Sequence, residues 1–224
     1  METVVLSLGG SLIAPDKPDY FFLSEFKNFI VNRINSYRFV IVCGGGKTNY
    51  YYNEAGKRVS KIKKDDLDWI GIMATRLNAE LIRCIFGKIA LDKVIIDPTK
   101  NIRTKKQIVI AAGWKPGRST DFVAVLLAKQ FKAKKIINLT NVSYVYDKDP
   151  RKYSDAKKIP NLSWKEYRKI VGNKWTPRLS TPFDPIASKS AEINKVAVAM
   201  VSGKNLRHID LFLENRPFDG TIIS

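Results

Sequence analysis

The chain has 224 residues, of which 45% are hydrophobic and 27% charged, and its formal net charge is +18. This composition suits a globular protein with a sizeable core, and no apolar run approaches the ~20 residues that a membrane-spanning helix needs. With 2 cysteines the chain lacks a disulfide framework, so we expect a reducing, cytoplasmic location and no secretory signal.

Segments typical of strands and helices alternate along the chain. In chain order we expect strand 3–10, helix 20–37, strand 39–43, helix 65–86, strands 92–97 and 106–113, helix 119–131, strand 134–140, helix 184–193, strand 194–203 and helix 205–214. This alternation predicts an α/β fold with a largely parallel central sheet. In such sheets, ligands bind beyond the carboxyl ends of the strands.

Glycines gather where three of the expected strands end. The chain reads LGGS at 8–11, CGGGK at 43–47 and GWKPGRST at 113–120. Glycine allows backbone N–H groups to approach a ligand closely, and the N-terminus of a following helix adds partial positive charge. Neither the Walker pattern GxxxxGK[ST] nor the dinucleotide pattern GxGxxG is present. The turns therefore predict binding of more than one phosphate-bearing ligand, at a nucleotide site that differs from both of these known types.

The excess of positive charge has two interpretations. A nucleic-acid-binding protein is one, but the lysines are scattered over segments such as 57–64, 100–106, 129–135 and 157–169, and no nucleic-acid-binding module appears. The other is a solvated, lysine-rich surface whose potential attracts small anionic substrates such as nucleotides. We expect the second, with no nucleic-acid partner.

An ordered set of motifs resembles the amino acid kinase superfamily and, within it, the uridylate (UMP) kinases of the archaeal-like type. The motifs are GGS, GGGK, DWIGIMATRLNA, GWKPGRSTDFVAVLLA, NVSYVYDKDP, FDPIASK and a terminal GT. The resemblance implies a three-layer αβα sandwich in a single domain, 1–224, with an acceptor-nucleotide lobe at about 1–105 and an ATP lobe at about 106–224. It also implies transfer of the γ-phosphoryl group of ATP to UMP with Mg²⁺, and a homohexamer.

The resemblance assigns roles to positions of this sequence. Asp184 and Lys189 match residues at the transferring phosphoryl group, and Mg²⁺ is expected to be carried mainly by nucleotide phosphates. The positions that match UMP-binding residues, with Asp68 at the ribose, are Gly45, Asp68, Gly113, Trp114, Lys115, Pro116, Gly117, Arg118, Ser119 and Thr120. The positions that match ATP-binding residues are Gly9, Gly10, Ser11, Gly46, Thr140, Tyr146 and Asp149, and we expect Lys47 on the ATP side as well.

Three places depart from the family pattern. Ser7 stands where many members carry a lysine, Tyr50 where arginine is usual, and Ser143–Tyr144 where an Asp-Gly turn is usual. A hydroxyl cannot replace an ammonium group at a phosphate. The departures keep open a kinase for another small phosphate ester, such as isopentenyl phosphate, and a nucleotide-binding protein without catalysis. His208, the single histidine of the sequence, is expected to have a structural role and no catalytic one.

Overall fold

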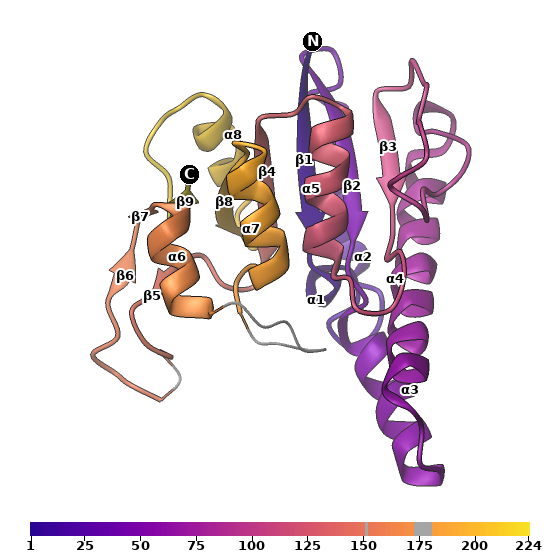
Figure 1. Cartoon of the computed structure of the whole chain (residues 1–224). Helices are drawn as coiled ribbons and strands as arrows, with labels where there is room; N and C mark the ends of the chain where they lie inside the picture. Colours follow the sequence, from indigo (N-terminus) through magenta and orange to yellow (C-terminus); the bar gives the residue numbers. More distant parts are fainter. Residues whose placement is uncertain (151, 173–180) are drawn as a thin grey trace.

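The computed structural model describes residues 1–150, 152–172 and 181–224. Its main sheet has 7 strands in the order β3-β2-β1-β4-β8-β9-β7 (Figure 1). In that order the strands span Ile108–Ala111, Tyr37–Cys43, Glu2–Leu8, Lys135–Thr140, Ala197–Ser202, Gly220–Ile223 and Asn161–Leu162. Neighbouring strands are parallel except β8 and β9. A second sheet pairs β5 (Val145–Tyr146) with β6 (Lys158–Ile159).

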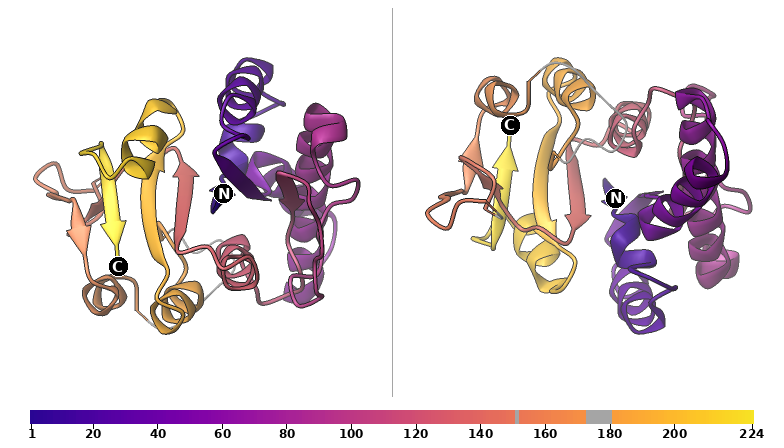
Figure 2. Two further views of the ribbon diagram at one scale, coloured as in Figure 1. Left: turned by 90° about the horizontal axis from the view of Figure 1, so that it is seen from above. Right: turned by 90° about the horizontal axis from the view of Figure 1, so that it is seen from below.

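Helices cover both faces of the main sheet, as Figure 2 shows from above and below. Helices α2, α8 and the C-terminal half of α4 pack on one face, and α5, α6 and α7 pack on the other. The described helices are α1 (Gly10–Ile13), α2 (Tyr20–Val31), α3 (Gly46–Val59), α4 (Lys64–Phe86), the 3₁₀ turn η1 (Gly87–Ile89), α5 (Thr120–Gln130), α6 (Trp164–Val171), α7 (Pro185–Ile193) and α8 (Arg207–Leu213). The predicted three-layer αβα sandwich is confirmed.

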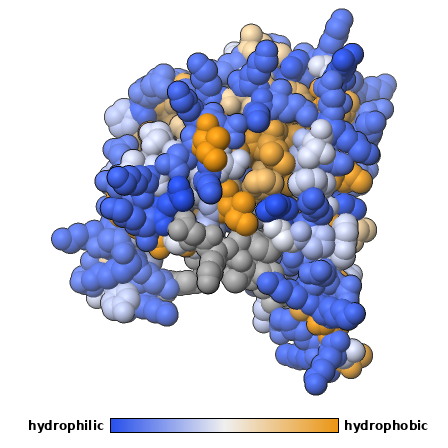
Figure 3. Space-filling model, in the orientation of Figure 1, coloured by the Kyte–Doolittle hydropathy of each residue, from blue (hydrophilic) through white to orange (hydrophobic). Residues whose placement is uncertain are grey.

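The central strands are apolar on both faces because both faces are covered. In β1, Val4, Leu6 and Leu8 belong to one core cluster, and Val5 belongs to the other. The outer surface is mostly hydrophilic on the side drawn in Figure 3. No helix within the described ranges combines the length and the apolar character that crossing a bilayer requires.

One expected strand, 92–97, is wrong. This segment touches β3 through one isolated bridge, Ile95 with Ala111, and Ala90, just before the segment, makes another with Ile108. Exposed Asp92 and Lys93 bend away between the two contacts, so no continuous ladder forms. The strand expected at 106–113 is present but shorter, at 108–111.

Candidate active site

The glycine-rich turns meet at one edge of the sheet, at the carboxyl ends of the parallel strands β1, β2, β3 and β4 (Figure 1). Hydrogen bonds join two of the turns to neighbouring strands: the N–H of Gly9 donates to the carbonyl of Leu139 in β4 at 2.8 Å, and the N–H of Gly44 donates to the carbonyl of Leu8 in β1 at 2.9 Å. The turns that the sequence places far apart therefore form one surface.

Two of these turns are packed backbone against backbone. A Cβ on Gly10 would lie 2.1 Å from the nitrogen of Gly46, and a Cβ on Gly46 would lie 2.3 Å from the carbonyl oxygen of Gly10. Gly46 also has a φ of +59°, which disfavours other residues. Glycine at these positions is thus required by the contact of the two turns, in addition to any ligand.

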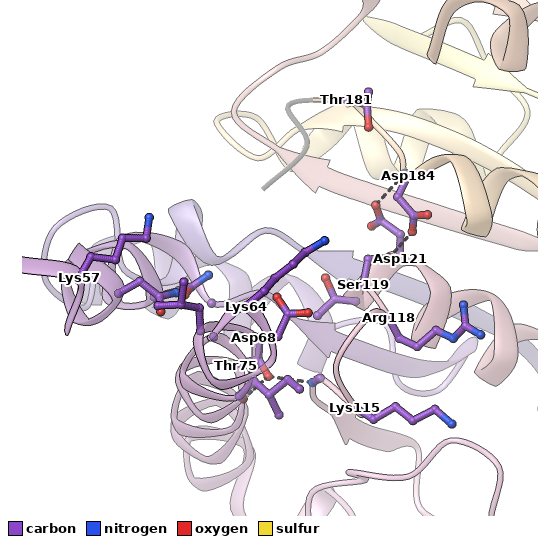
Figure 4. Close-up of a pocket in the computed structure, with 18 residues that line it drawn as sticks. Lys57, Lys64, Asp68, Thr75, Lys115, Arg118, Ser119, Asp121, Thr181 and Asp184 are labelled. Atoms are coloured by element: carbon purple, nitrogen blue, oxygen red, sulfur yellow. Dashed lines mark hydrogen bonds between the residues drawn. The ribbon is translucent and has the colours of Figure 1, made fainter. Parts of the chain in front are cut away.

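A first cavity of about 370 Å³ opens beside these turns, between α3, α4, the 113–121 segment and the start of α7 (Figure 4). Eight of the residues predicted for the site line it: Gly45, Asp68, Gly113, Lys115, Arg118, Ser119, Thr120 and Asp184. Trp114, Pro116 and Gly117, although predicted, are not among the residues that line it.

Hydrogen bonds hold the 113–120 segment against α4. The backbone N–H of Gly117 donates to Oδ2 of Asp68 at 3.0 Å. The N–H of Gly113 donates to the hydroxyl of Thr75 at 2.8 Å, and Arg76 donates to the carbonyl of Trp114 at 3.2 Å. Because the cavity wall is fixed at three points, Asp68 stands in a defined position toward the cavity.

A pair of carboxylates, Asp121 and Asp184, lies at the other side of the first cavity. The Ser7 hydroxyl donates to Asp121 Oδ1 at 3.1 Å, and the backbone N–H of Asp184 donates to Asp121 Oδ2 at 3.2 Å. Asp184 caps α7 by accepting hydrogen bonds from the N–H groups of Ile186 and Ala187, and it also accepts one from the Ser119 hydroxyl. Four side chains from β1, α5, α7 and the 113–120 segment thus share one network.

Asp121 is the functional candidate that the sequence reasoning missed. Loss of water contact raises the pKa of Asp121 from 3.8 to about 7, and the Asp184 carboxylate adds to the rise. The signal available in the sequence was its place in the STD segment directly after Ser119 and Thr120. Ser7, expected only as a missing lysine, is one of its partners.

Besides the predicted Lys115 and Arg118, the first cavity has two positive side chains that the sequence did not single out. Lys57 and Lys64 line the first cavity and extend from α3 and α4 on the side opposite Asp121 and Asp184 (Figure 4). Lys189 is exposed on α7 and Lys47 is exposed on α3, and neither lines the first cavity. The nearest acidic partner of Lys47 is Asp16, with Nζ to Oδ1 at 3.9 Å.

A second cavity of about 660 Å³ adjoins the first. Thr140, Tyr146 and Asp149, all predicted on the ATP side, line it. Thr181 lines both cavities, and within the described structure its buried hydroxyl has no hydrogen-bond partner. The other positions predicted for ATP, namely Gly9, Gly10, Ser11, Gly46 and Lys47, line neither cavity.

The departure at Ser143–Tyr144 has a structural account. The Tyr144 hydroxyl donates to Asp219 at 3.2 Å, and the Lys158 ammonium lies 4.7 Å from the ring centroid of Tyr144. Tyr144 lines the second cavity and ties this loop to the segment before β9. Among the residues described, no three His, Cys, Asp or Glu side chains are grouped as a metal site.

Comparison with known proteins places the chain among kinases. The sequence model of the amino acid kinase family matches residues 2–202. Uridylate kinase of Thermoplasma volcanium is 31% identical over 217 residues, 96% of this chain and 95% of that protein. Uridylate kinase of Pyrococcus abyssi is 35% identical over 189 residues, 83% of each chain. The crystal structure of uridylate kinase from Archaeoglobus fulgidus matches the whole of both chains with a TM-score of 0.84 and 30% identity.

Proposed function

The chain belongs to the amino acid kinase family, and from this premise we propose that it is a UMP kinase that transfers the γ-phosphoryl group of ATP to UMP, releasing UDP and ADP. The observation that carries the proposal is the pair of adjoining cavities at one edge of the sheet, which share Thr181. Phosphoryl transfer from one nucleotide to another requires that the two be held end to end, with the attacking and leaving oxygens in line. Relatives that cover nearly the whole chain bear the name uridylate kinase.

In this proposal UMP occupies the first cavity. Asp68, which offers a carboxylate to hydroxyl groups, binds the ribose. The 113–120 segment, fixed to α4 by hydrogen bonds, surrounds the nucleoside. Gly45 and Lys64 lie where a phosphate group would need a close backbone and a positive charge.

ATP occupies the second cavity, with its adenosine beside Tyr146 and Asp149 and its phosphates directed toward Thr181. Most of the catalytic effect then comes from positioning and from neutralising charge, because little covalent chemistry is left to the protein. Lys189, one turn into the helix that Asp184 caps, is proposed to reach the phosphates when they bind. Its flexible stem allows a side chain that is exposed in the free protein to make this movement.

Mg²⁺ bound to the nucleotide phosphates would neutralise part of their charge. Asp121 and Asp184, two carboxylates at the wall of the first cavity, are the oxygen ligands of a type that Mg²⁺ prefers. Since the described part of the chain holds no cluster of three such groups, the nucleotides would supply the remaining oxygen ligands. Asp184 also orients the N-terminus of α7 toward the phosphates.

The finer parts of the proposal follow from the family resemblance. We place the acceptor-nucleotide lobe at about 1–105 and the ATP lobe at about 106–224, and the enzyme in the cytoplasm, in pyrimidine nucleotide synthesis. A homohexamer is proposed as well. Helix α4 supports self-association because Trp69, Met73 and Leu77 form a stripe at four-residue spacing, with 44%, 57% and 64% of each residue exposed.

An assay of ADP release tests the proposed activity. The protein is supplied with ATP and Mg²⁺ and is offered UMP, CMP, dTMP or isopentenyl phosphate separately. We expect turnover with UMP well above the other three, since isopentenyl phosphate has no ribose for Asp68 to bind. Preference for isopentenyl phosphate would reject the proposed acceptor, and binding of UMP without any ADP release would identify a protein that has lost catalysis.

A further inference from the structure

Asn53, on α3, holds an unpaired polar atom at the wall of the first cavity. The residue is 3% exposed and lines the cavity. Its Nδ2 donates to Oδ1 of Asn49 at 2.5 Å, whereas its own Oδ1 has no hydrogen-bond partner in the described part of the chain. Buried amide oxygens are nearly always paired in folded proteins, so this one needs an explanation.

The position of Asn53 places it opposite the predicted ribose ligand. Asn49, Asn53 and Lys57 follow each other at four-residue spacing, so they share one face of α3, and all three line the cavity. Helices α3 and α4 form a helical hairpin, in which they run in opposite directions (Figure 1). The Asn49 amide meets Gly71 of α4, since a Cβ on Gly71 would lie 3.0 Å from Asn49 Oδ1.

This register brings Asn53 level with Asp68. Asn53 lies one turn after Asn49 on α3, and Asp68 lies about one turn before Gly71 on α4. The two helices run in opposite directions. The residue one turn after Asn49 on α3 therefore faces the residue about one turn before Gly71 on α4. Asn53 and Asp68, whose side chains each carry a hydrogen-bond acceptor, therefore line the cavity from facing helices.

The ligand group that fits between two acceptors is one with two neighbouring donors. In UMP, a fully ionised phosphate offers none, and the uracil ring offers a single N–H. The ribose offers two adjacent hydroxyls, each of which donates one hydrogen bond. Of these groups, the ribose diol alone matches the pair.

We infer that Oδ1 of Asn53 accepts a hydrogen bond from a ribose hydroxyl of the acceptor nucleotide, across from Asp68, and makes the enzyme select ribonucleotides over deoxyribonucleotides. The inference rests on the proposed UMP kinase function. A buried acceptor that loses its donor rejects the deoxy analogue, because the protein oxygen is then left without a partner. Asn49 is a positioning residue in this arrangement, since it fixes the orientation of the Asn53 amide.

Calorimetric titration with UMP, 2′-deoxy-UMP and 3′-deoxy-UMP tests the inference. For the wild-type protein we expect UMP to bind about tenfold more tightly than at least one of the deoxy analogues, the size of one hydrogen bond to a buried neutral group. Asn53→Leu removes the acceptor and should reduce that ratio to about threefold or less. Asn53→Asp keeps an oxygen acceptor and should keep the ratio, although the added negative charge weakens the binding of all three anions.

Tyr52→Leu is the matched control, because Tyr52 is 68% exposed on the same helix and does not line the cavity. It should leave every ratio unchanged, and circular dichroism establishes that each variant is folded. The inference is wrong if the folded Asn53→Leu variant keeps the wild-type ratios, or if wild-type protein binds both deoxy analogues as tightly as UMP. Both results leave the kinase function intact, whereas failure of the wild type to bind UMP would reject that function and the inference with it.

Discussion

Asp121 is the residue of the first cavity whose chemistry the sequence did not reveal. It lies at the wall of the first cavity, bound by Ser7 and by the backbone of Asp184. Loss of water contact and the neighbouring Asp184 raise its pKa to about 7. Near neutral pH the Asp121 carboxyl group is therefore partly protonated. Binding of a cation or of phosphates nearby will change the fraction that carries the proton.

Asp121→Asn should change how stability depends on pH. Between pH 3.8 and about 7 the folded protein holds the Asp121 proton and the unfolded chain does not, so this group's contribution to the free energy of unfolding falls as pH rises. The Asp121→Asn variant has no titrating group at this position, so its free energy of unfolding does not fall with pH for this reason. Urea unfolding at a series of pH values should show the variant gaining stability relative to wild type across that window. A difference between variant and wild type that stays constant with pH would contradict the assignment.

Asp68 and Lys189 are expected to separate binding from turnover. Asp68→Ala should raise the KM for UMP about tenfold or more with a smaller change in kcat, because it removes a charged acceptor from the ribose. Lys189→Ala should lower kcat by about tenfold or more, because an ammonium group acts on charge that develops in the transition state. Steady-state kinetics measures both. Lys129→Ala, an exposed lysine in the last turn of α5, is the control, and an unchanged kcat in the Lys189 variant would reject its role.

At this scale the sequence anticipated several residues that line the first cavity, but not its lysines Lys57 and Lys64. Asp68, Asp184 and Ser119 were expected, and the structure brings them to one cavity. Lys64 was not singled out because an exposed lysine at the start of a helix resembles any other lysine on a lysine-rich surface. Its position depends on how α3 and α4 pack, which residue spacing along one helix does not reveal.

The elements that matter most are the two glycine turns after β1 and β2. They bring the backbone of Gly10 against that of Gly46, closer than any side chain would allow. From the sequence alone, the glycines indicate only space for a ligand. Contact between the turns was hidden from it because the two segments are far apart in the chain and meet only through the pairing of β1 with β2.

Gly10→Ala should destabilise the protein much more than Gly87→Ala. A methyl group on Gly10 would overlap backbone atoms that cannot move aside, so we expect a loss above about 3 kcal/mol or failure to fold. Gly87 also has a positive φ, of +55°, with a ψ of −130°, but its Cβ would meet nothing within 4 Å, so its cost is the local backbone strain of about 1–3 kcal/mol. Urea denaturation gives both values. Equal losses would show that conformation, and not contact, accounts for the glycine at position 10.

The remaining elements divide by the strength of their sequence pattern. Long apolar strands and amphipathic helices were predicted within a few residues, as β1, β2, β4, α4 and α5 show. The short strands β5, β6, β7 and β9 were missed, because two to four residues carry too little periodicity to be recognised. Helix α6 was missed too, although Ser163 and Glu166 form a capping box that marks its start.

At the scale of the whole molecule, the exposed apolar stripe on α4, formed by Trp69, Met73 and Leu77, is the proposed subunit contact. Leu77→Lys should dissociate the proposed oligomer, because a charge would replace a side chain that a second copy covers. Sedimentation velocity should show a smaller species with unchanged secondary structure. Val59→Lys is the control, since Val59 is 88% exposed but lies outside the stripe. If the wild type sediments as a monomer, or if the Leu77 variant keeps the wild-type size, the stripe is not a subunit contact.

The central proposal is that UMP and ATP bind in adjoining cavities and meet at Thr181. A single ligand that contains both, adenosine and uridine joined through five phosphates, tests it most directly by calorimetry with competition. We predict that one such molecule binds per chain, and that either UMP or a non-hydrolysable ATP analogue, added alone in excess, displaces it. Binding that only one of the two nucleotides can reverse, or two molecules bound per chain, would contradict a shared site.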